Sequence, residues 1–135
     1  MKRLTGILVL VSLLLALAIP VFAVNGGGII IGNELIFRIR HDSAGMTIQQ
    51  RADAVTMRLN EVLGCPCIYV NLIKIKKQGS NYAIMYDKSL IITVDKQTAA
   101  SNGISTKQLA KIWANNLKRV LPEAKANNCG ATCEI

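Results

Sequence analysis

Hydrophobic residues recur with a helical period after Thr47-Ile48-Gln49-Gln50. This stretch has the form of a capping box, in which Thr47 accepts a hydrogen bond from a helix amide and Gln50 reaches back. Apolar spacings of four and three then continue to Leu63, which predicts an amphipathic helix. Gly64 suits the left-handed position after a helix, and Pro66 prevents continuation. The expected buried stripe is Ile48, Ala52, Val55, Leu59 and Val62.

A second capping box, Ser105-Thr106-Lys107-Gln108, predicts a second helix that ends at Pro122. The segment from Asp95 to Gly103, which precedes it, is expected to be a loop. The apolar side of this helix is expected to comprise Leu109, Ile112, Trp113, Leu117, Val120 and Leu121.

Alternating residues near the amino terminus predict a short strand at Ile29–Ile31, a turn at Gly32-Asn33 and a strand at Glu34–Arg40. Because side chains alternate along a strand, one set should face the core and the other the opposite side. The expected core set is Leu35, Phe37 and Ile39, and the opposite set is Ile36, Arg38 and Arg40.

Three further strands are predicted at Ile68–Lys76, Tyr82–Tyr86 and Leu90–Val94. The alternation of the first of these slips midway, which indicates a bulge near Leu72. The order β(β)-α-β-β-β-α, without internal repeats, predicts an α+β fold. We expect a two-layer sandwich with both helices packed on one face of a mainly antiparallel sheet.

The amino-terminal sequence "MKRLTGILVLVSLLLALAIPVFA" has the pattern of a secretory signal peptide, with cations, an apolar run and small residues before the expected cleavage site. The alternative is an uncleaved membrane anchor, because the apolar run approaches the ~20 residues that span a bilayer. No cysteine follows the run, which excludes a lipoprotein anchor. We expect a signal peptide at 1–23, a flexible lead-in with a short first strand at 24–34, an α+β domain at 35–122, and a tail with cysteines at 123–135.

The full chain carries 16 Lys and Arg against 8 Asp and Glu, and loss of Lys2 and Arg3 with the signal peptide changes the net charge from +8 to +6. This basic balance favours an anionic envelope polymer or an envelope protein as partner. The alternative is a solvated surface that keeps the protein soluble. If the strands that carry them are neighbours, Arg38, Arg40, Lys74 and Lys76 form a basic strip on the sheet face away from the helices.

Four cysteines follow the two predicted helices: Cys65, Cys67, Cys129 and Cys133. Both helices should run in the same direction, so both pairs should lie at one end of the domain. Three pairings are open: the local pairing, Cys65–Cys67 with Cys129–Cys133, and the two crossed pairings. The crossed pairings are favoured, because a Cys65–Cys67 bond would strain the disulfide torsion. A disulfide closing a loop of ~60 residues stabilises by roughly 4 kcal/mol in the loop-entropy model.

Two alternatives give the same four cysteines a chemical role. As thiolates they could bind Zn²⁺ or Cu⁺, although their spacings differ from the C-x2-C pairs usual for zinc. A redox-active Cys-Pro-Cys is the other alternative, but Cys65 follows the carboxyl end of a helix, which does not lower a thiol pKa. We expect structural disulfides and no metal.

Catalytic motifs are not evident in the sequence. His41-Asp42-Ser43 are adjacent in a loop, and adjacent residues do not generally give the geometry of a catalytic triad. No phosphate loop, metalloprotease helix or calcium loop occurs, and no paired carboxylates suggest an acid–base dyad. Aromatic residues are not interleaved with the cations as single-stranded nucleic-acid binding requires. We therefore expect a protein that is not an enzyme and that binds no cofactor and no specific nucleic acid.

Four segments give the chain a resemblance to a known family: Arg38-Ile39-Arg40, Gln50-Arg51-Ala52, the strand Leu90–Asp95, and Leu-Ala-x-x-Trp-Ala at Leu109–Ala114. Over Leu35–Leu121 the sequence resembles the periplasmic amino-terminal domain of some bacterial mechanosensitive ion channel proteins and their stand-alone exported relatives. No channel-forming helices follow in this sequence, and the four cysteines depart from the family pattern. The resemblance implies a non-catalytic extracytoplasmic module and supplies no ligand.

Overall fold

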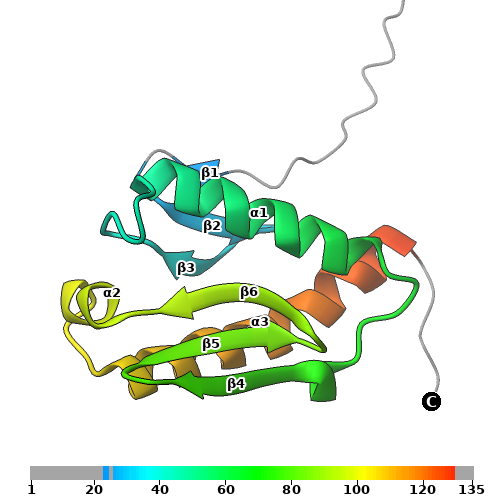
Figure 1. Cartoon of the computed structure of the whole chain (residues 1–135). Helices are drawn as coiled ribbons and strands as arrows, with labels where there is room; N and C mark the ends of the chain where they lie inside the picture. Colours follow the sequence, from blue (N-terminus) through cyan, green and yellow to red (C-terminus); the bar gives the residue numbers. More distant parts are fainter. Residues whose placement is uncertain (1–22, 25, 130–135) are drawn as a thin grey trace, which may run out of the picture.

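The computed structural model describes residues 23, 24 and 26–129 (Figure 1). The segment expected to be a signal peptide, except for Ala23, and Cys133 lie outside these residues. The strands are β1 (Ala23–Val24), β2 (Gly28–Ile31), β3 (Glu34–Arg38), β4 (Ile73–Gln78), β5 (Asn81–Tyr86) and β6 (Ser89–Val94). The helices are α1 (Ile48–Gly64), a short 3-10 helix (Val70–Leu72), α2 (Lys96–Ser101) and α3 (Thr106–Cys129).

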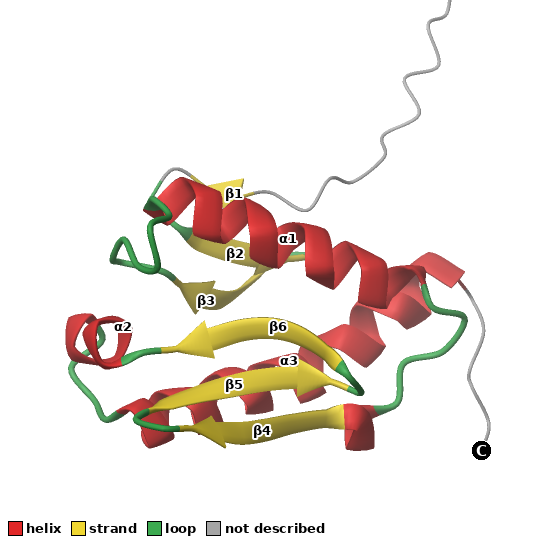
Figure 2. Ribbon diagram, viewed as in Figure 1, coloured by secondary structure: helices red, strands yellow, loops and turns green. Residues whose placement is uncertain are grey.

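The strands form two antiparallel sheets of three strands each, in the orders β1-β2-β3 and β4-β5-β6 (Figure 2). The α+β class is confirmed, whereas the sequence suggested a single sheet. Helix α1 contacts β1 and β2 of one sheet and β6 of the other, and α3 contacts β3, β4 and β5. The two helices thus join both sheets around one hydrophobic core. Of the helices in the described part of the chain, none is long and apolar enough to cross a membrane.

Strand β3 contains a bulge that reverses the expected facing of two residues. Phe37 pairs with Ile29 and Leu35 pairs with Ile30, so Ile36 is the extra residue between them. Leu35 is therefore 45% exposed and Ile36 only 2% exposed, contrary to the regular alternation expected from the sequence. A bulge inserts one residue and shifts the phase of all residues on one side of it. Phe37 and Ile39 are buried as expected.

The strand expected from Ile68 begins only at Ile73. The residues before it form the 3-10 helix, so the slip in alternation near Leu72 marks a helical turn and not a bulge. This turn is attached to the end of the next hairpin, because the amide of Asp87 donates to the Leu72 carbonyl at 2.9 Å. The amide of Tyr69 donates to the Tyr86 hydroxyl at 3.2 Å.

Helix α1 begins with the predicted capping box. The Gln50 amide donates to Thr47 Oγ1 at 3.2 Å, and the Thr47 amide donates to Gln50 Oε1 at 2.9 Å. The expected stripe is confirmed at Ala52, Val55, Leu59 and Val62, which are all buried, while Ile48 is half-buried. Gly64, however, is the last residue of the helix and does not have the left-handed conformation expected for it.

Helix α3 also begins with its predicted capping box, at Ser105 and Gln108. The expected end at Pro122 was wrong, because the helix continues through the proline to Cys129. A proline inside a helix removes one backbone hydrogen bond, and the flanking turns of this helix stay helical despite that loss. Ile112 was expected in the core but is 48% exposed, whereas Trp113 is buried with its ring 4.9 Å from that of Phe37.

Helix α2 occupies the segment expected to be a loop. Its cap is Asp95, whose Oδ1 accepts a hydrogen bond from the Thr98 amide at 2.7 Å. Aspartate is one of the preferred residues at this position because its carboxylate satisfies a free amide of the first turn. Asp95 itself was the sequence signal for this helix, because the cap bond needs only the backbone amide of residue 98.

Candidate functional site

One face of the β4–β5–β6 sheet is not covered by a helix of the described chain. Helix α3 packs behind the sheet in the view of Figure 1, and α1 lies beside β6. Residues directly opposite each other on neighbouring strands share a face. The register therefore places six residues on the uncovered side, which we call the open face: Lys74, Met85 and Leu90 in one row, and Lys76, Ala83 and Thr93 in the next.

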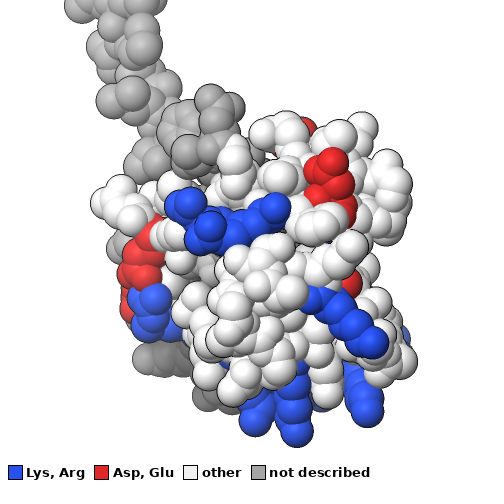
Figure 3. All heavy atoms as spheres, turned by 90° about the vertical axis from the view of Figure 1, so that its left-hand side faces the viewer, with Lys and Arg blue, Asp and Glu red and all other residues white. Residues whose placement is uncertain are grey.

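Two of the four cations expected to form a basic strip lie on the open face. Lys74 and Lys76 are both exposed there, and neither makes an ion pair with a described residue. Arg38 is in the other sheet, where it pairs with Gly28, and Arg40 lies in the loop after β3. The single strip of four was wrong because β3 and β4 belong to different sheets. The side view in Figure 3 also shows Lys and Arg in separate groups.

A groove of about 210 Å³ adjoins the open face, between α1, the loop after β3 and strand β6. Its apolar lining consists of Ala44, Met46, Ala54, Val55, Leu90 and Ile92. Its polar lining consists of Ser43, Arg51, Arg58, Asn81, Thr93 and Asp95. Leu90 and Thr93 belong both to this groove and to the open face, so the two surfaces are continuous.

Arg58 is the cation of the groove that has no carboxylate partner among the described residues. Its Nη1 donates to the backbone carbonyl of Ile91 at 3.2 Å. This bond fixes the half-buried guanidinium against β6 but uses only one of the five N–H donors that the group carries. The other donors form no hydrogen bond with a described residue.

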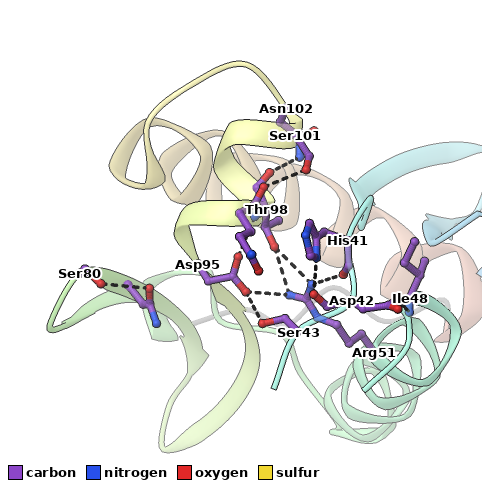
Figure 4. Close-up of polar contacts among 12 residues, drawn as sticks. His41, Asp42, Ser43, Ile48, Arg51, Ser80, Asp95, Thr98, Ser101 and Asn102 are labelled. Atoms are coloured by element: carbon purple, nitrogen blue, oxygen red, sulfur yellow. Dashed lines mark hydrogen bonds and ion pairs between the residues drawn. The ribbon is translucent and has the colours of Figure 1, made fainter. Parts of the chain in front are cut away.

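Arg51, in contrast, is enclosed in a polar cluster that connects the loop after β3 to the start of α2 (Figure 4). Its Nη2 lies 3.7 Å from Asp95 Oδ2, and its Nη1 donates to the His41 carbonyl at 2.6 Å. Both Nη atoms also lie 3.3 Å from Thr98 Oγ1. The cluster thus joins residues far apart in the sequence. Arg51 and Asp95 lie in segments that carry the family resemblance, but neither was selected from the sequence as a candidate site residue.

Asp95 accepts hydrogen bonds on both carboxylate oxygens. Ser43 Oγ donates to Oδ2 at 2.6 Å, and the Thr98 amide donates to Oδ1. Burial alone raises the pKa of Asp95, but the hydrogen bonds from Ser43 and Thr98, together with the charge of Arg51, lower it more. The pKa of this carboxyl therefore lies below its ordinary value of 3.8, and the group is ionised at neutral pH.

The adjacent residues His41, Asp42 and Ser43 have separate structural contacts. His41 Nδ1 contacts the backbone oxygen of Asp42, Asp42 Oδ1 accepts from the Ile48 amide at 2.7 Å, and Ser43 donates to Asp95. The Ser43 hydroxyl is thus directed to a carboxylate and not to an imidazole, which differs from the arrangement of a serine hydrolase triad.

The carboxyl ends of α1 and α3 lie at the same end of the molecule, as the helix directions predict. Lys125 Nζ donates to the Leu63 carbonyl at 2.9 Å, which connects the last turns of both helices. Cys65 is a free thiol whose Sγ lies 3.7 Å from the Glu61 carbonyl oxygen, whereas Cys67 is not a free thiol. Within the described residues no group of three His, Cys, Asp or Glu side chains is placed to hold a metal ion.

No curated protein and no solved structure matches the chain. The family model described as domain of unknown function DUF8459 matches residues 28–124, which extend from the start of β2 into the last turns of α3. Since the matched residues, 28–124 of 135, make up well over half of the chain, the chain belongs to the DUF8459 family.

Proposed function

We propose that the protein is an exported, non-catalytic binding domain whose open face engages an anionic partner, either a protein or an envelope component. The observation that carries this proposal is the pair Lys74 and Lys76, exposed side by side on a sheet face that α3 does not cover. Solvated charges without partners attract an oppositely charged surface and accelerate its association. The resemblance noted from the sequence favours the same type of function.

The double variant Lys74→Glu/Lys76→Glu is expected to bind an isolated anionic cell-wall polymer, or polyglutamate, about tenfold more weakly than the unchanged protein. Reversing two exposed charges replaces attraction by repulsion at the proposed contact, and thermal unfolding should change little because both side chains are solvated. Affinity is measured by fluorescence anisotropy at low and at physiological ionic strength.

The matched control is Lys111→Glu/Lys118→Glu, which makes the same change of net charge at exposed positions of α3. This control should bind almost as well as the unchanged protein. An equal loss of affinity in both double variants would show that net charge alone governs binding, and the open face would then have no special role.

The same proposal includes one disulfide, between Cys67 and either Cys129 or Cys133. Support comes from the adjacent ends of α1 and α3, and from the signal-peptide pattern, because exported proteins meet an oxidising environment. Cys65 was expected to form a disulfide too, but its thiol is free and lies against the last turn of α1. A disulfide between Cys67 and the tail closes a loop of more than 60 residues and stabilises by roughly 4 kcal/mol in the loop-entropy model.

Alkylation of the protein without reductant, followed by mass spectrometry, is expected to label two of the four cysteines, with Cys65 one of them. Four labelled cysteines after removal of one bound metal ion per chain would instead favour the alternative function, a soft-metal protein using Cys65, Cys67, Cys129 and Cys133. Four reactive thiols without metal would eliminate the disulfide and leave the open-face proposal unaffected.

A further inference from the structure

We infer that the groove between α1 and β6 binds an extended acidic peptide segment of a partner protein, with Arg58 holding a carboxylate and the apolar lining accepting a neighbouring aliphatic side chain. This inference deepens the proposed function and rests on it, since the groove continues directly into the open face through Leu90 and Thr93.

The volume of the groove limits the size of the group that can bind in it. Sites for whole small-molecule ligands commonly occupy ~300 to 1,000 Å³. A groove of about 210 Å³ is smaller, so it suits one or two side chains of a longer molecule that continues outside it. The open face provides the surface for that continuation.

The charge of the groove is set by Arg58. The charge of Arg51 is balanced by Asp95, and both are held by hydrogen bonds within their own cluster. Arg58 therefore contributes an unbalanced positive charge with free N–H donors beside apolar walls. A planar guanidinium matches the geometry of a carboxylate, which can accept two parallel hydrogen bonds from it.

The spacing from the groove to the lysines also fits a peptide. Lys74 and Lys76 lie on β4, two strands away from the β6 residues that line the groove. Neighbouring strands are ~4.8 Å apart, so this separation is roughly 10 Å, which an extended peptide covers in about three residues. A peptide with acidic residues at such intervals can contact Arg58 and a lysine together.

An anionic polymer without aliphatic groups could contact the lysines but would leave the apolar lining unoccupied. Met46 and Leu90 expose apolar surface in the groove, above the buried side chains of Val55 and Ile92, and this surface gains free energy only when apolar atoms cover it. Asn81 and Thr93 add hydrogen-bonding groups suited to peptide amides. The combination favours a peptide over a polymer.

Two labelled peptides of equal length and charge test the inference, one alternating glutamate with leucine and the other glutamate with serine. The leucine peptide is expected to bind the protein about tenfold more tightly by fluorescence anisotropy, because only it covers the apolar lining. Arg58→Gln should weaken both peptides about tenfold, since a hydrogen bond to a charged group is lost. Leu90→Ser should weaken only the leucine peptide.

Arg58→Lys keeps the positive charge without the planar fork, and it remains informative if Arg58→Gln does not fold. It should recover only part of the lost affinity. The control Lys118→Gln, on α3, removes one exposed charge far from the groove in the fold and should leave both affinities unchanged.

The outcomes separate the inference from the function on which it rests. Equal affinity of the two peptides, or unchanged affinity in the Arg58 and Leu90 variants, would overturn the groove as the binding site. If Lys74→Glu/Lys76→Glu still weakened binding in that case, the open-face proposal would stand. Binding of cell-wall polymer but of neither peptide would also overturn the inference while retaining the open face.

Discussion

Replacing Gly27 by alanine is expected to destabilise the domain by at least about 3 kcal/mol, measured by urea denaturation. Gly27 has a φ of +75°, and a Cβ placed on it would lie 2.1 Å from the Ile39 carbonyl oxygen and 2.5 Å from Ile48 Cγ2. The Gly27 carbonyl also accepts the Ile39 amide at 2.8 Å. In the Gly27→Ala variant the added methyl group would therefore push the start of β2 away from the segment after β3 and from the start of α1.

Gly32→Ala is the matched control, because Gly32 also has a positive φ, of +62°, but nothing lies within 4 Å of its Cβ position. Only the left-handed conformation is then penalised, at a cost of roughly 1–2 kcal/mol. If both variants lost the same stability, the close approach at Gly27 would have no energetic importance.

Asp95→Ala is expected to lower the free energy of unfolding by about 3 to 5 kcal/mol, because it leaves the charge of Arg51 buried without its counterion. The Arg51 and Asp95 side chains are only 8% and 16% exposed. The substitution also removes the cap of α2 and the acceptor for Ser43. Urea denaturation measures the loss, and protease cleavage near 41–47 reports release of the loop after β3.

Glu34→Ala provides the control for an exposed ion pair. Glu34 lies only 2.6 Å from Arg119, but these side chains are 44% and 53% exposed, and such pairs contribute less than about 1 kcal/mol. Burial, and not the shorter distance, should therefore determine which ion pair, Arg51–Asp95 or Arg119–Glu34, contributes more to the free energy of unfolding. A larger loss in Glu34→Ala than in Asp95→Ala would contradict this argument.

The low pKa of Asp95 also gives the sign of a pH effect. A carboxyl whose pKa is lower in the folded than in the unfolded chain contributes stability that is fully present above the unfolded value, which for Asp95 is the ordinary 3.8. This contribution is lost as the pH falls through the lower folded value. The stability difference between the unchanged protein and Asp95→Asn should therefore shrink at acidic pH, below about pH 4.

Local signals in the sequence predicted where α1 and α3 begin, whereas α2 was missed. Both capping boxes depend on side chains three residues apart, so the sequence alone contains the interaction. The end of α3 was not predictable from Pro122, because the cost of a helical proline is local and the helix continues on both sides of it. The sequence also predicted the wrong orientation for Leu35 and Ile36, since the bulge that exposes one and buries the other arises from the pairing of β3 with β2.

The candidate site depended on contacts between distant segments. Arg51 and Asp95 meet only when the loop after β3 reaches the start of α2. No motif around either residue in the sequence predicts that the two side chains form an ion pair. The sequence correctly predicted that Lys74 and Lys76 share one face, because residues two apart along a strand point to the same side. Their grouping with Arg38 and Arg40 failed because alternation says nothing about which strands share a sheet.

Strand β4 forms an edge of its sheet, and three of its six residues are lysines. An unpaired strand edge exposes amide and carbonyl groups to which another molecule can add a strand, and lysine side chains oppose this by mutual repulsion. The lysines of β4 are therefore expected to oppose self-association as well. Acetylation of these amines, or neutralisation by excess polyanion, would remove the repulsion and favour fibrous aggregates that begin at this strand.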